Sequence, residues 1–271
     1  TTSVSILPEQ REYERTSTTV VNAYVLPVMA SYLIALQDGL RRAGVTAPLF
    51  ISNSNGGLAP VHVAQAKPVM FISSGRAAGV AGAGHMGRLS GISNLVAFDM
   101  GGTTASASLI KDGELARTTE YEFRDGISTP SRFIKAGGYL MRVPTVDVAE
   151  IGNGAGSIAQ VDEGGLISVG PLSAGASPGP ACYGAGGDRP TLTDANLVLG
   201  YLPDQLAGGS MALSVDLAAA AIERHVAGPA GLTLIEAALG MRAIANSNMS
   251  RAIRAVTVER GQDPRDFVLF A

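Results

Sequence analysis

The stretch that most constrains the fold is "NLVAFDMGGTTASASLI", residues 94–110. An apolar run leads into Asp99, two adjacent glycines and two threonines follow, and the chain then becomes apolar again. Apolar runs of about four to eight residues bounded by turn residues are typical of buried strands. The pattern therefore predicts a β-turn-β element with a carboxylate at the end of its first strand.

The predicted turn has the residue types of a phosphate site. Glycine at 101 and 102 permits positive φ and leaves no side chain between backbone N–H groups and a ligand. Thr103 and Thr104 add hydroxyl donors, so the turn can form a nest for phosphate oxygens. Asp99 would hold a hydrated Mg²⁺ beside these oxygens, as phosphoryl transfer requires. The alternative is a plain hairpin in which Asp99 caps the turn.

Helical and strand-like segments alternate along the chain, which places it in the α/β class. Apolar spacing predicts helices at 11–44, 76–89, 191–202, 215–228 and 234–261. Strand-like runs occupy 47–56 and 67–75, three successive runs within 94–123, and 267–271. Thr193 or Asp194 is the expected cap of the helix in 191–202.

The helix predicted at 11–44 is expected to begin at a cap formed by Thr16, Ser17 or Thr18. Pro27 lies inside it and predicts a kink. The face predicted to pack on the protein is Val21, Tyr24, Val25, Val28, Tyr32 and Leu36.

Composition divides the chain into three predicted parts. Residues 1–127 are the portion with the hairpin, 128–190 a β-rich, glycine-rich insertion, and 191–271 a helical return to the first portion. The sequence starts without Met and ends on "RDFVLFA", inside an apolar run. We therefore expect a fragment of a longer protein.

Charge and cysteine content exclude several classes. The net charge is −3 with scattered Lys and Arg, which leaves no electrostatic footprint for nucleic acid. The single cysteine, Cys182, excludes a disulfide framework and fits a reducing cytoplasm. It has no basic neighbour to lower its pKa, which favours a structural role over a nucleophile. No apolar run is expected to reach the length of a membrane span.

A second glycine motif, "GAGHMG" at 82–87, matches the dinucleotide fingerprint G-x-G-x-x-G, and Asp99 follows near the spacing of a ribose-binding acid. That fingerprint must follow its strand directly. Here the preceding strand-like run ends near Ser73 and the glycines lie in a helical pattern. Close helix packing is the favoured interpretation, and a dinucleotide-binding oxidoreductase is a less favoured alternative.

The third glycine motif, "GNGAGS" at 152–157, lies between two strand-like segments. Its backbone amides could line an anion or substrate site, with Gly154, Gly156 and Ser157 as contacts. A glycine-rich hairpin is an equal alternative. Asn55 and Gly56 form a loop after a strand and are further substrate candidates, with a plain turn as the other possibility.

The chain resembles the hydantoinase A/5-oxoprolinase family over nearly its whole length. The matching stretches are "LPEQREYERTSTTVVNAYV", "SNGGL", "SGRAAGVAGA", "NLVAFDMGGTT", "IGNGAGSIA", "VGPLSAGASPGPACYG", "PTLTDANLVLGYL" and "RAIRAVTVERGQDPRDF". The resemblance implies part of an actin-like/sugar-kinase-like (ribonuclease H-like) ATPase fold. It also implies that 1–127 and 191–271 belong to the ATPase core, that ATP and Mg²⁺ are the cofactors, and that Asp99 is the catalytic acid that holds Mg²⁺ through water.

The activity implied by this resemblance is phosphorylation of a cyclic amide or ketone oxygen by ATP, followed by hydrolysis or carboxylation. The implied partner is a B-type (hydantoinase B-like) subunit or domain. Such ATPases close two D-x-G-G-T hairpins on ATP. Only one is present, at 99–103, and the adenosine loop is expected beyond 271. The isolated fragment is therefore expected to be inactive and to bind nucleotide weakly.

The sequence departs from the family pattern after the hairpin. Many relatives continue as GGT-S-T-D, whereas here the run is "GGTTASA", with Ala105 and Ser106. This variant resembles the branch with the acetone and acetophenone carboxylase subunits. Arg76 stands where relatives usually have proline. These departures motivate the alternative of a non-catalytic or degenerate subunit that assembles with a B-type partner.

Overall fold

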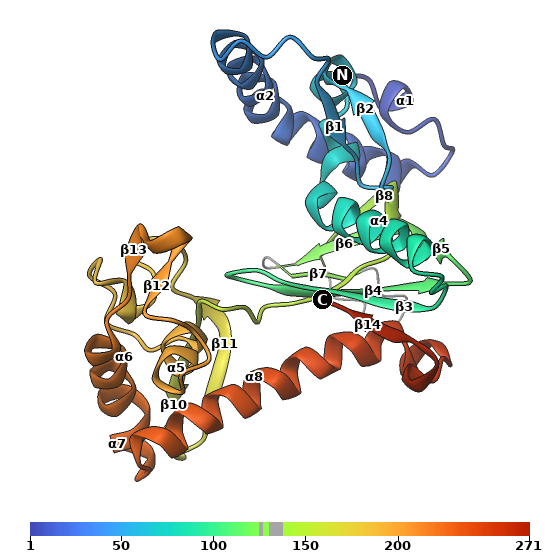
Figure 1. Cartoon of the computed structure of the whole chain (residues 1–271). Helices are drawn as coiled ribbons and strands as arrows, with labels where there is room; N and C mark the ends of the chain where they lie inside the picture. Colours follow the sequence, from blue (N-terminus) through green and yellow to red (C-terminus); the bar gives the residue numbers. More distant parts are fainter. Residues whose placement is uncertain (125–126, 130–137) are drawn as a thin grey trace. The chain divides into compact units, whose positions relative to one another are not determined.

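The computed structural model describes residues 1–124, 127–129 and 138–271 (Figure 1). Helices and strands alternate in it, so the predicted α/β class is confirmed. The chain forms two compact units. Unit 1 comprises Thr1–Phe98, Ala107–Ala149 and Val256–Ala271, and unit 2 comprises Asp99–Ser106 and Glu150–Ala255. These bounds differ from those of the three parts expected from composition. The three-part division into domains stays a prediction.

The elements of the first half of the chain are α1 (Ser3–Ile6), α2 (Glu12–Arg42), β1 (Phe50–Ser52), β2 (Leu58–Pro60), α3 (Val61–Ala66), α4 (Ser74–Leu89), β3 (Leu95–Met100), β4 (Ala105–Lys111), β5 (Glu114–Leu115), β6 (Arg117–Arg124), β7 (Ile127–Thr129) and β8 (Tyr139–Val146). The strand predicted at 67–75 is wrong, because Pro68–Phe71 forms a 3₁₀ turn. The β-turn-β element predicted at 94–110 is confirmed as β3 and β4.

The elements that follow are β9 (Ala149–Ile151), β10 (Ser157–Val161), β11 (Ile167–Ser173), α5 (Leu192–Val198), β12 (Gln205–Leu206), β13 (Met211–Ala212), α6 (Val215–Ile222), α7 (Gly228–Ala230), α8 (Leu234–Val256) and β14 (Val268–Phe270). The helix predicted at 215–228 is α6 continued by a π-helical turn, Glu223–Ala227.

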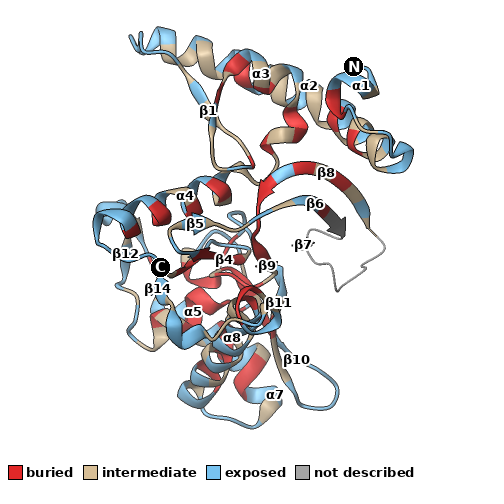
Figure 2. Cartoon of the chain, turned by 90° about the vertical axis from the view of Figure 1, so that its right-hand side faces the viewer, coloured by how far each residue is buried: buried red, intermediate tan, exposed pale blue. Residues whose placement is uncertain are grey.

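The hairpin belongs to a sheet of order β14-β3-β4-β5, and β9 also pairs with β4. β14 runs parallel to β3, with Val268 opposite Leu95, and β5 runs antiparallel to β4. Helix α4 packs on this sheet through a buried apolar cluster: Ala77, Val80, Ala83, Leu95, Ala97, Ile110, Val146 and Val148. Figure 2 shows burial along β4, which runs through the interior.

The motif at 82–87 lies inside α4, so it has no strand and turn before it. A Cβ added at Gly87 would lie 2.5 Å from Leu95 Cδ1 and 2.8 Å from the Ile92 carbonyl oxygen. One added at Gly84 would lie 3.2 Å from Leu115 Cδ1, whereas one at Gly82 meets open space. Gly84 and Gly87 therefore serve close helix packing, whereas Gly82 does not, and the dinucleotide alternative loses the local geometry on which it depends.

Gly87→Ala is expected to lower the free energy of unfolding by about 1–3 kcal/mol, because its methyl group overpacks the contact between α4 and β3. Gly82→Ala is the matched control and is expected to raise it by about 0.5–1 kcal/mol, through helix propensity alone. Urea unfolding followed by circular dichroism measures both. Equal effects of the two variants would contradict the packing role of Gly87.

Helix α2 begins at Glu12, with Arg11 as a cap residue that makes no side-chain capping bond, so the cap predicted at 16–18 is wrong. The predicted packing face is wrong in part, because Tyr24 is 83% exposed and Val28 is 73% exposed, whereas Val21 and Leu36 do pack on buried clusters. The fully buried residues of the helix are Leu33 and two polar residues. Asn22 Oδ1 accepts a bond from Val69 N at 3.2 Å, which offsets the cost of burying that oxygen, whereas Asn22 Nδ2 is buried without a partner among the described residues.

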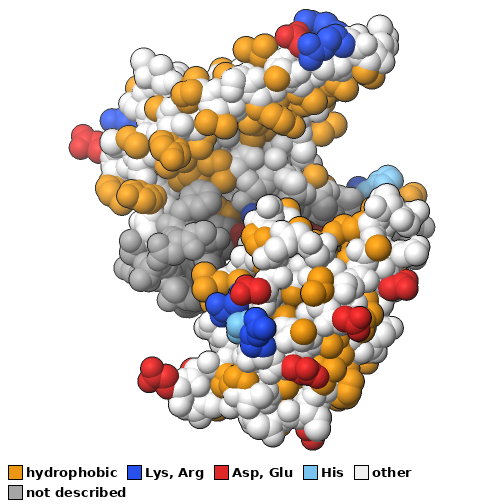
Figure 3. All heavy atoms as spheres, turned by 90° about the vertical axis from the view of Figure 1, so that its left-hand side faces the viewer, with side chains coloured by type: hydrophobic (Ala, Val, Ile, Leu, Met, Phe, Trp, Pro, Cys, Tyr) orange, Lys and Arg blue, Asp and Glu red, His pale blue; other side chains and the backbone are white. Residues whose placement is uncertain are grey.

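The exposed side of α2 is rich in large hydrophobic side chains: Tyr13, Val20, Tyr24, Val28, Tyr32 and Ile34. Figure 3 shows hydrophobic side chains in the upper part of the view, where Figure 1 also has α2. By length and composition α2 passes the test for a membrane-crossing helix, so the expectation that no segment reaches that length is wrong. Only 11% of its apolar window is buried, unlike the mostly buried core helices of soluble proteins that pass the same test, and the absence of a membrane partner stays a prediction.

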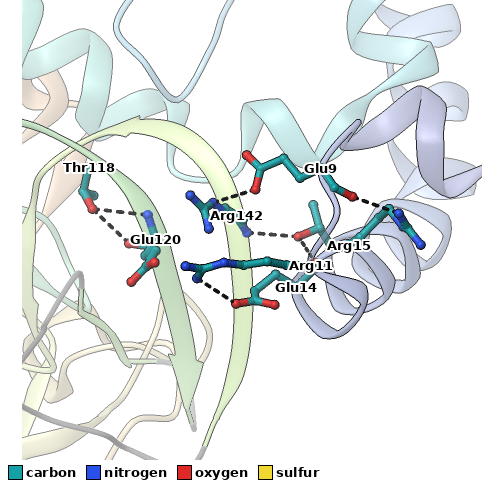
Figure 4. A network of polar contacts seen from close by, with 8 residues as sticks. Glu9, Arg11, Glu14, Arg15, Thr118, Glu120 and Arg142 are labelled. Carbon is teal, nitrogen blue, oxygen red and sulfur yellow. Dashed lines mark hydrogen bonds and ion pairs between the residues drawn. The ribbon is translucent and has the colours of Figure 1, made fainter.

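Polar contacts fix the first turns of α2 to β8 (Figure 4). The Arg142 backbone N–H donates to Thr18 Oγ1 at 3.0 Å, and Arg142 Nε lies 2.9 Å from Glu9 Oε2. Arg15 donates to the Glu9 carbonyl oxygen at 2.8 Å. Because these partners belong to unit 1, they favour α2 as a helix of a folded unit.

Candidate functional site

The hairpin turn, Asp99–Thr104, lies in unit 2. The Gly101 N–H donates to the Thr104 carbonyl oxygen at 2.9 Å, which closes the turn. Asp99 and the residues 101–103 are exposed, whereas Ala105 begins the buried part of β4. The turn therefore presents its backbone to solvent at the end of a buried hairpin.

Neither Gly101 nor Gly102 has a positive φ, so the conformational reason predicted for them is wrong. The turn closes without a left-handed residue. The second predicted reason was that no side chain stands between the backbone N–H groups and a ligand. The structure agrees with it, because a Cβ added at Gly102 would point into space with no atom within 4 Å. Glycine at 102 therefore leaves open space beside its peptide groups, into which a larger side chain would project.

The glycine loop, residues 152–157, docks directly on the hairpin turn. Ala155 N donates to the Gly101 carbonyl oxygen at 3.0 Å, and Gly156 N donates to the Gly102 carbonyl oxygen at 2.6 Å. A Cβ added at Gly154 would lie 2.6 Å from the Gly101 oxygen and 2.7 Å from the Gly102 carbonyl carbon. Contact this close requires glycine at 154. The two glycine motifs, far apart in the sequence, thus form one structure.

The N–H groups of residues 153–157 all donate inside the protein. Their acceptors are, in order, the Ile151 carbonyl, Ser157 Oγ, and the carbonyls of Gly101, Gly102 and Gly154. Amides already used in this way offer no free donors to an anion, which favours a supporting role for the loop. Contact of Gly154, Gly156 and Ser157 with substrate stays a prediction.

Anchoring the two carbonyls also orients the amides that follow them. In a trans peptide the C=O and N–H bonds point in opposite directions. Because the Gly101 and Gly102 oxygens face the glycine loop, the N–H groups of Gly102 and Thr103 face away from it. Among the described residues, no hydrogen bond comes from the N–H of Gly102, Thr103 or Thr104. Successive free N–H groups at an exposed turn are an anion-binding arrangement.

Asp99 is exposed on β3, two residues before Gly101, and its carboxylate makes no hydrogen bond or ion pair within the described part of the chain. No group of three or more His, Cys, Asp or Glu that could hold a metal occurs among those residues. One carboxylate together with waters and phosphate oxygens is a usual donor set for Mg²⁺. The residues present therefore fit a magnesium ion that arrives with a phosphate ligand.

Ala105 and Ser106 are buried in β4, with 0% and 4% of their surface exposed. The departures from the family pattern at these positions thus lie inside the sheet. Asn55 and Gly56 belong to unit 1. Asn55 Oδ1 accepts from Gly57 N at 2.9 Å, and Gly56 has a φ of +85°, so both serve their own turn. Their contact with substrate stays a prediction.

Sequence reasoning missed the anchor behind the glycine loop. The Asp194 carboxylate is completely buried and accepts bonds from Thr191 N, Thr191 Oγ1 and Cys182 N at 2.7 Å each, and from Ala181 N at 3.3 Å. Thr191 caps α5, so the cap predicted at 193 or 194 is wrong. The T-x-x-D spacing in "TLTD" is an acidic variant of the capping box and was the available signal.

The Cys182 thiol lies beside this carboxylate and is 1% exposed. Burial raises the pKa of Cys182 far above its ordinary value, and the charge of Asp194 raises it further. A thiol that stays protonated is a poor nucleophile. The structure thus supports the structural role expected for Cys182.

A profile of the hydantoinase/oxoprolinase family matches residues 15–271. The chain is 46% identical over 269 residues to an uncharacterised protein of Methanocaldococcus jannaschii, covering 99% of this chain and 39% of that protein. It is 43% identical over 265 residues to the caprolactamase subunit alpha of Pseudomonas jessenii, covering 97% of this chain and 36% of that subunit.

Among solved structures, nucleotide-free acetone carboxylase, from work on ATP-dependent acetone carboxylation, matches with a TM-score of 0.85 and 27% identity. That match covers 99% of this chain and 36% of the carboxylase chain. The chain therefore spans well under half of the length of these relatives.

Proposed function

Because the chain belongs to the hydantoinase/oxoprolinase family, we propose that its hairpin turn binds the phosphates of ATP in an enzyme that activates a carbonyl oxygen. At the level of the family, the relatives are ATP-dependent amide hydrolases and carboxylases. For this chain, the proposed substrates are cyclic amides or ketones. Phosphoryl transfer from ATP to the substrate oxygen prepares it for hydrolysis or carboxylation.

The observation that carries this proposal is the pair of outward N–H groups at Gly102 and Thr103, whose carbonyl neighbours are held by the glycine loop. Catalysis of phosphoryl transfer depends on positioning and on donors aimed at phosphate oxygens. The hydroxyl groups of Thr103 and Thr104 add donors at the same turn. Asp99 is the residue that would hold Mg²⁺, which when bound neutralises phosphate charge.

The whole protein is proposed to complete this site with regions beyond the chain, because the relatives are more than twice as long. The relative from Pseudomonas jessenii is a subunit, which supports assembly with a partner subunit. A B-type partner is the proposed form. The alternative of a non-catalytic subunit keeps the same fold and assembly but lacks turnover.

The test is ATP hydrolysis by the complete gene product that contains this chain, with and without amide or ketone substrates. Gly102→Val is expected to lower turnover on the order of 10²-fold, since its side chain would fill the open space beside the donors. Its thermal midpoint is expected to match the unmodified protein.

Gly79→Val is the matched control, because a Cβ there also meets open space, on α4. It is expected to retain turnover. Unchanged kinetics in Gly102→Val would contradict the phosphate site. Intact assembly without any ATP turnover in the unmodified protein would support the non-catalytic alternative.

A further inference from the structure

Thr193 makes two hydrogen bonds to one carbonyl of the glycine loop. Its backbone N–H lies 2.8 Å from the Ala155 oxygen, and its Oγ1 donates to the same oxygen at 2.9 Å. Thr193 is 4% exposed, so these bonds are shielded from water. Its place at the start of α5 is fixed by the reciprocal capping bonds of Thr191 and Asp194. The loop is therefore held from a rigid helix terminus.

The Ala155 carbonyl and the Gly156 N–H are two ends of one peptide group. The oxygen end accepts from Thr193, and the N–H end donates to the Gly102 oxygen at 2.6 Å. The Gly102 carbonyl in turn shares its peptide group with the N–H of Thr103. Hydrogen bonds joined through peptide groups polarise one another, by about 10–30% per bond. The series of hydrogen-bonded groups therefore runs from Thr193 to the Ala155–Gly156 peptide group and from there to the Gly102–Thr103 peptide group.

We infer that Thr193 is a positioning residue for the anion donors of the hairpin turn, acting through the Ala155–Gly156 and Gly102–Thr103 peptide groups. The inference rests on the proposed function. Thr193 fixes the direction of the Thr103 N–H and strengthens it as a donor, without touching the ligand. Anion donors pre-oriented in this way need no rearrangement when phosphate binds.

The close contact at Gly154 supports this role independently of Thr193. The absent Cβ lets the loop approach the Gly101 and Gly102 carbonyls, and any side chain there would push the two segments apart. Ser173 Oγ donates weakly to the Gly102 oxygen at 3.5 Å, from the end of β11. The Gly102 carbonyl is thus held by groups from two segments, both positioned within unit 2.

The experiment compares Thr193→Val and Thr193→Ser in the complete gene product. Thr193→Val removes only the hydroxyl bond, keeps the backbone bond and preserves volume. It is expected to raise the KM for ATP about three- to tenfold, the size expected from one hydrogen bond, with a smaller change in kcat. Thr193→Ser is expected to restore the KM. Thr19→Val is the control, since the Thr19 hydroxyl donates to the Arg15 carbonyl at 2.6 Å, on α2.

Amide hydrogen exchange gives a second readout that does not need activity. Loosening the loop in Thr193→Val is expected to speed exchange of the Ala155 and Gly156 amides several-fold, while amides of α8 keep their rates. A KM and exchange rates equal to those of the unmodified protein would overturn the inference. If the unmodified protein hydrolyses no ATP, the proposed function fails, and the exchange rates alone decide whether Thr193 holds the loop.

Discussion

Asp99→Ala is expected to reduce ATP turnover of the complete gene product by on the order of 10²–10³-fold, the usual loss when a group that stabilises transferred charge is removed. Folding is expected to be unaffected, within about 0.5 kcal/mol, because the exposed side chain makes no hydrogen bond with other described residues. Steady-state kinetics across a Mg²⁺ titration, with the thermal midpoint, measure both effects.

Asp99→Asn separates charge from shape. It keeps an oxygen at the same position but lacks the negative charge that favours Mg²⁺, so we expect a loss close to that of Asp99→Ala. Asp188→Ala removes another exposed aspartate of unit 2 and is expected to retain turnover. Full activity of Asp99→Asn at ordinary Mg²⁺ concentrations would exclude Asp99 as the metal-side acid.

Asp194→Asn is expected to lower the free energy of unfolding by about 2–3 kcal/mol, because bonds to a charged acceptor contribute about 1.5–3 kcal/mol each and the new amide faces a donor. Four donors surround the buried carboxylate, and an amide group can accept from one side only. The thermal midpoint is expected to fall by about 4–12 °C. Calorimetry of the chain measures the change.

Asp162→Asn is the matched control for this loss. Asp162 also accepts from two backbone amides, those of Gly164 and Leu166, but it is exposed at the turn between β10 and β11. Water replaces its lost bonds, so the expected change is below about 0.5 kcal/mol. A similar loss in both variants would show that burial of Asp194 is not the cause.

The hairpin at 94–110 could be predicted because its signal is local: two apolar runs, a carboxylate and turn residues in sequence order. The absence of positive φ at Gly101 could not, since composition does not select among turn geometries. Docking of Gly154 on the turn is a long-range contact that leaves no local pattern other than small residues. The bonds of Thr193 to Ala155 are also long-range contacts, so the sequence indicated only a helix cap at this position.

The packing face of α2 was mispredicted at Tyr24 and Val28 because the helix is apolar on more than one side. Tyr24 and Val28 have helical spacing, but so do residues around Leu33, and only the folded unit shows which side is covered. The burial of a polar residue of α2 could not be predicted either. Asn22 is completely buried, and its Oδ1 accepts from a backbone amide distant in the sequence, a partner that periodicity cannot identify.

The interleaving of the two units has a consequence for synthesis on the ribosome. Asp99–Ser106 emerges before its companions in unit 2, Glu150–Ala255. Chains generally fold as they emerge, amino end first, and contacts between distant segments wait for the later one. The hairpin turn can form at once, but its amides are aimed only after the loop and Thr193 have left the exit tunnel. A nascent chain halted before that point would contain the hairpin turn, but the N–H groups of the turn would not yet be oriented.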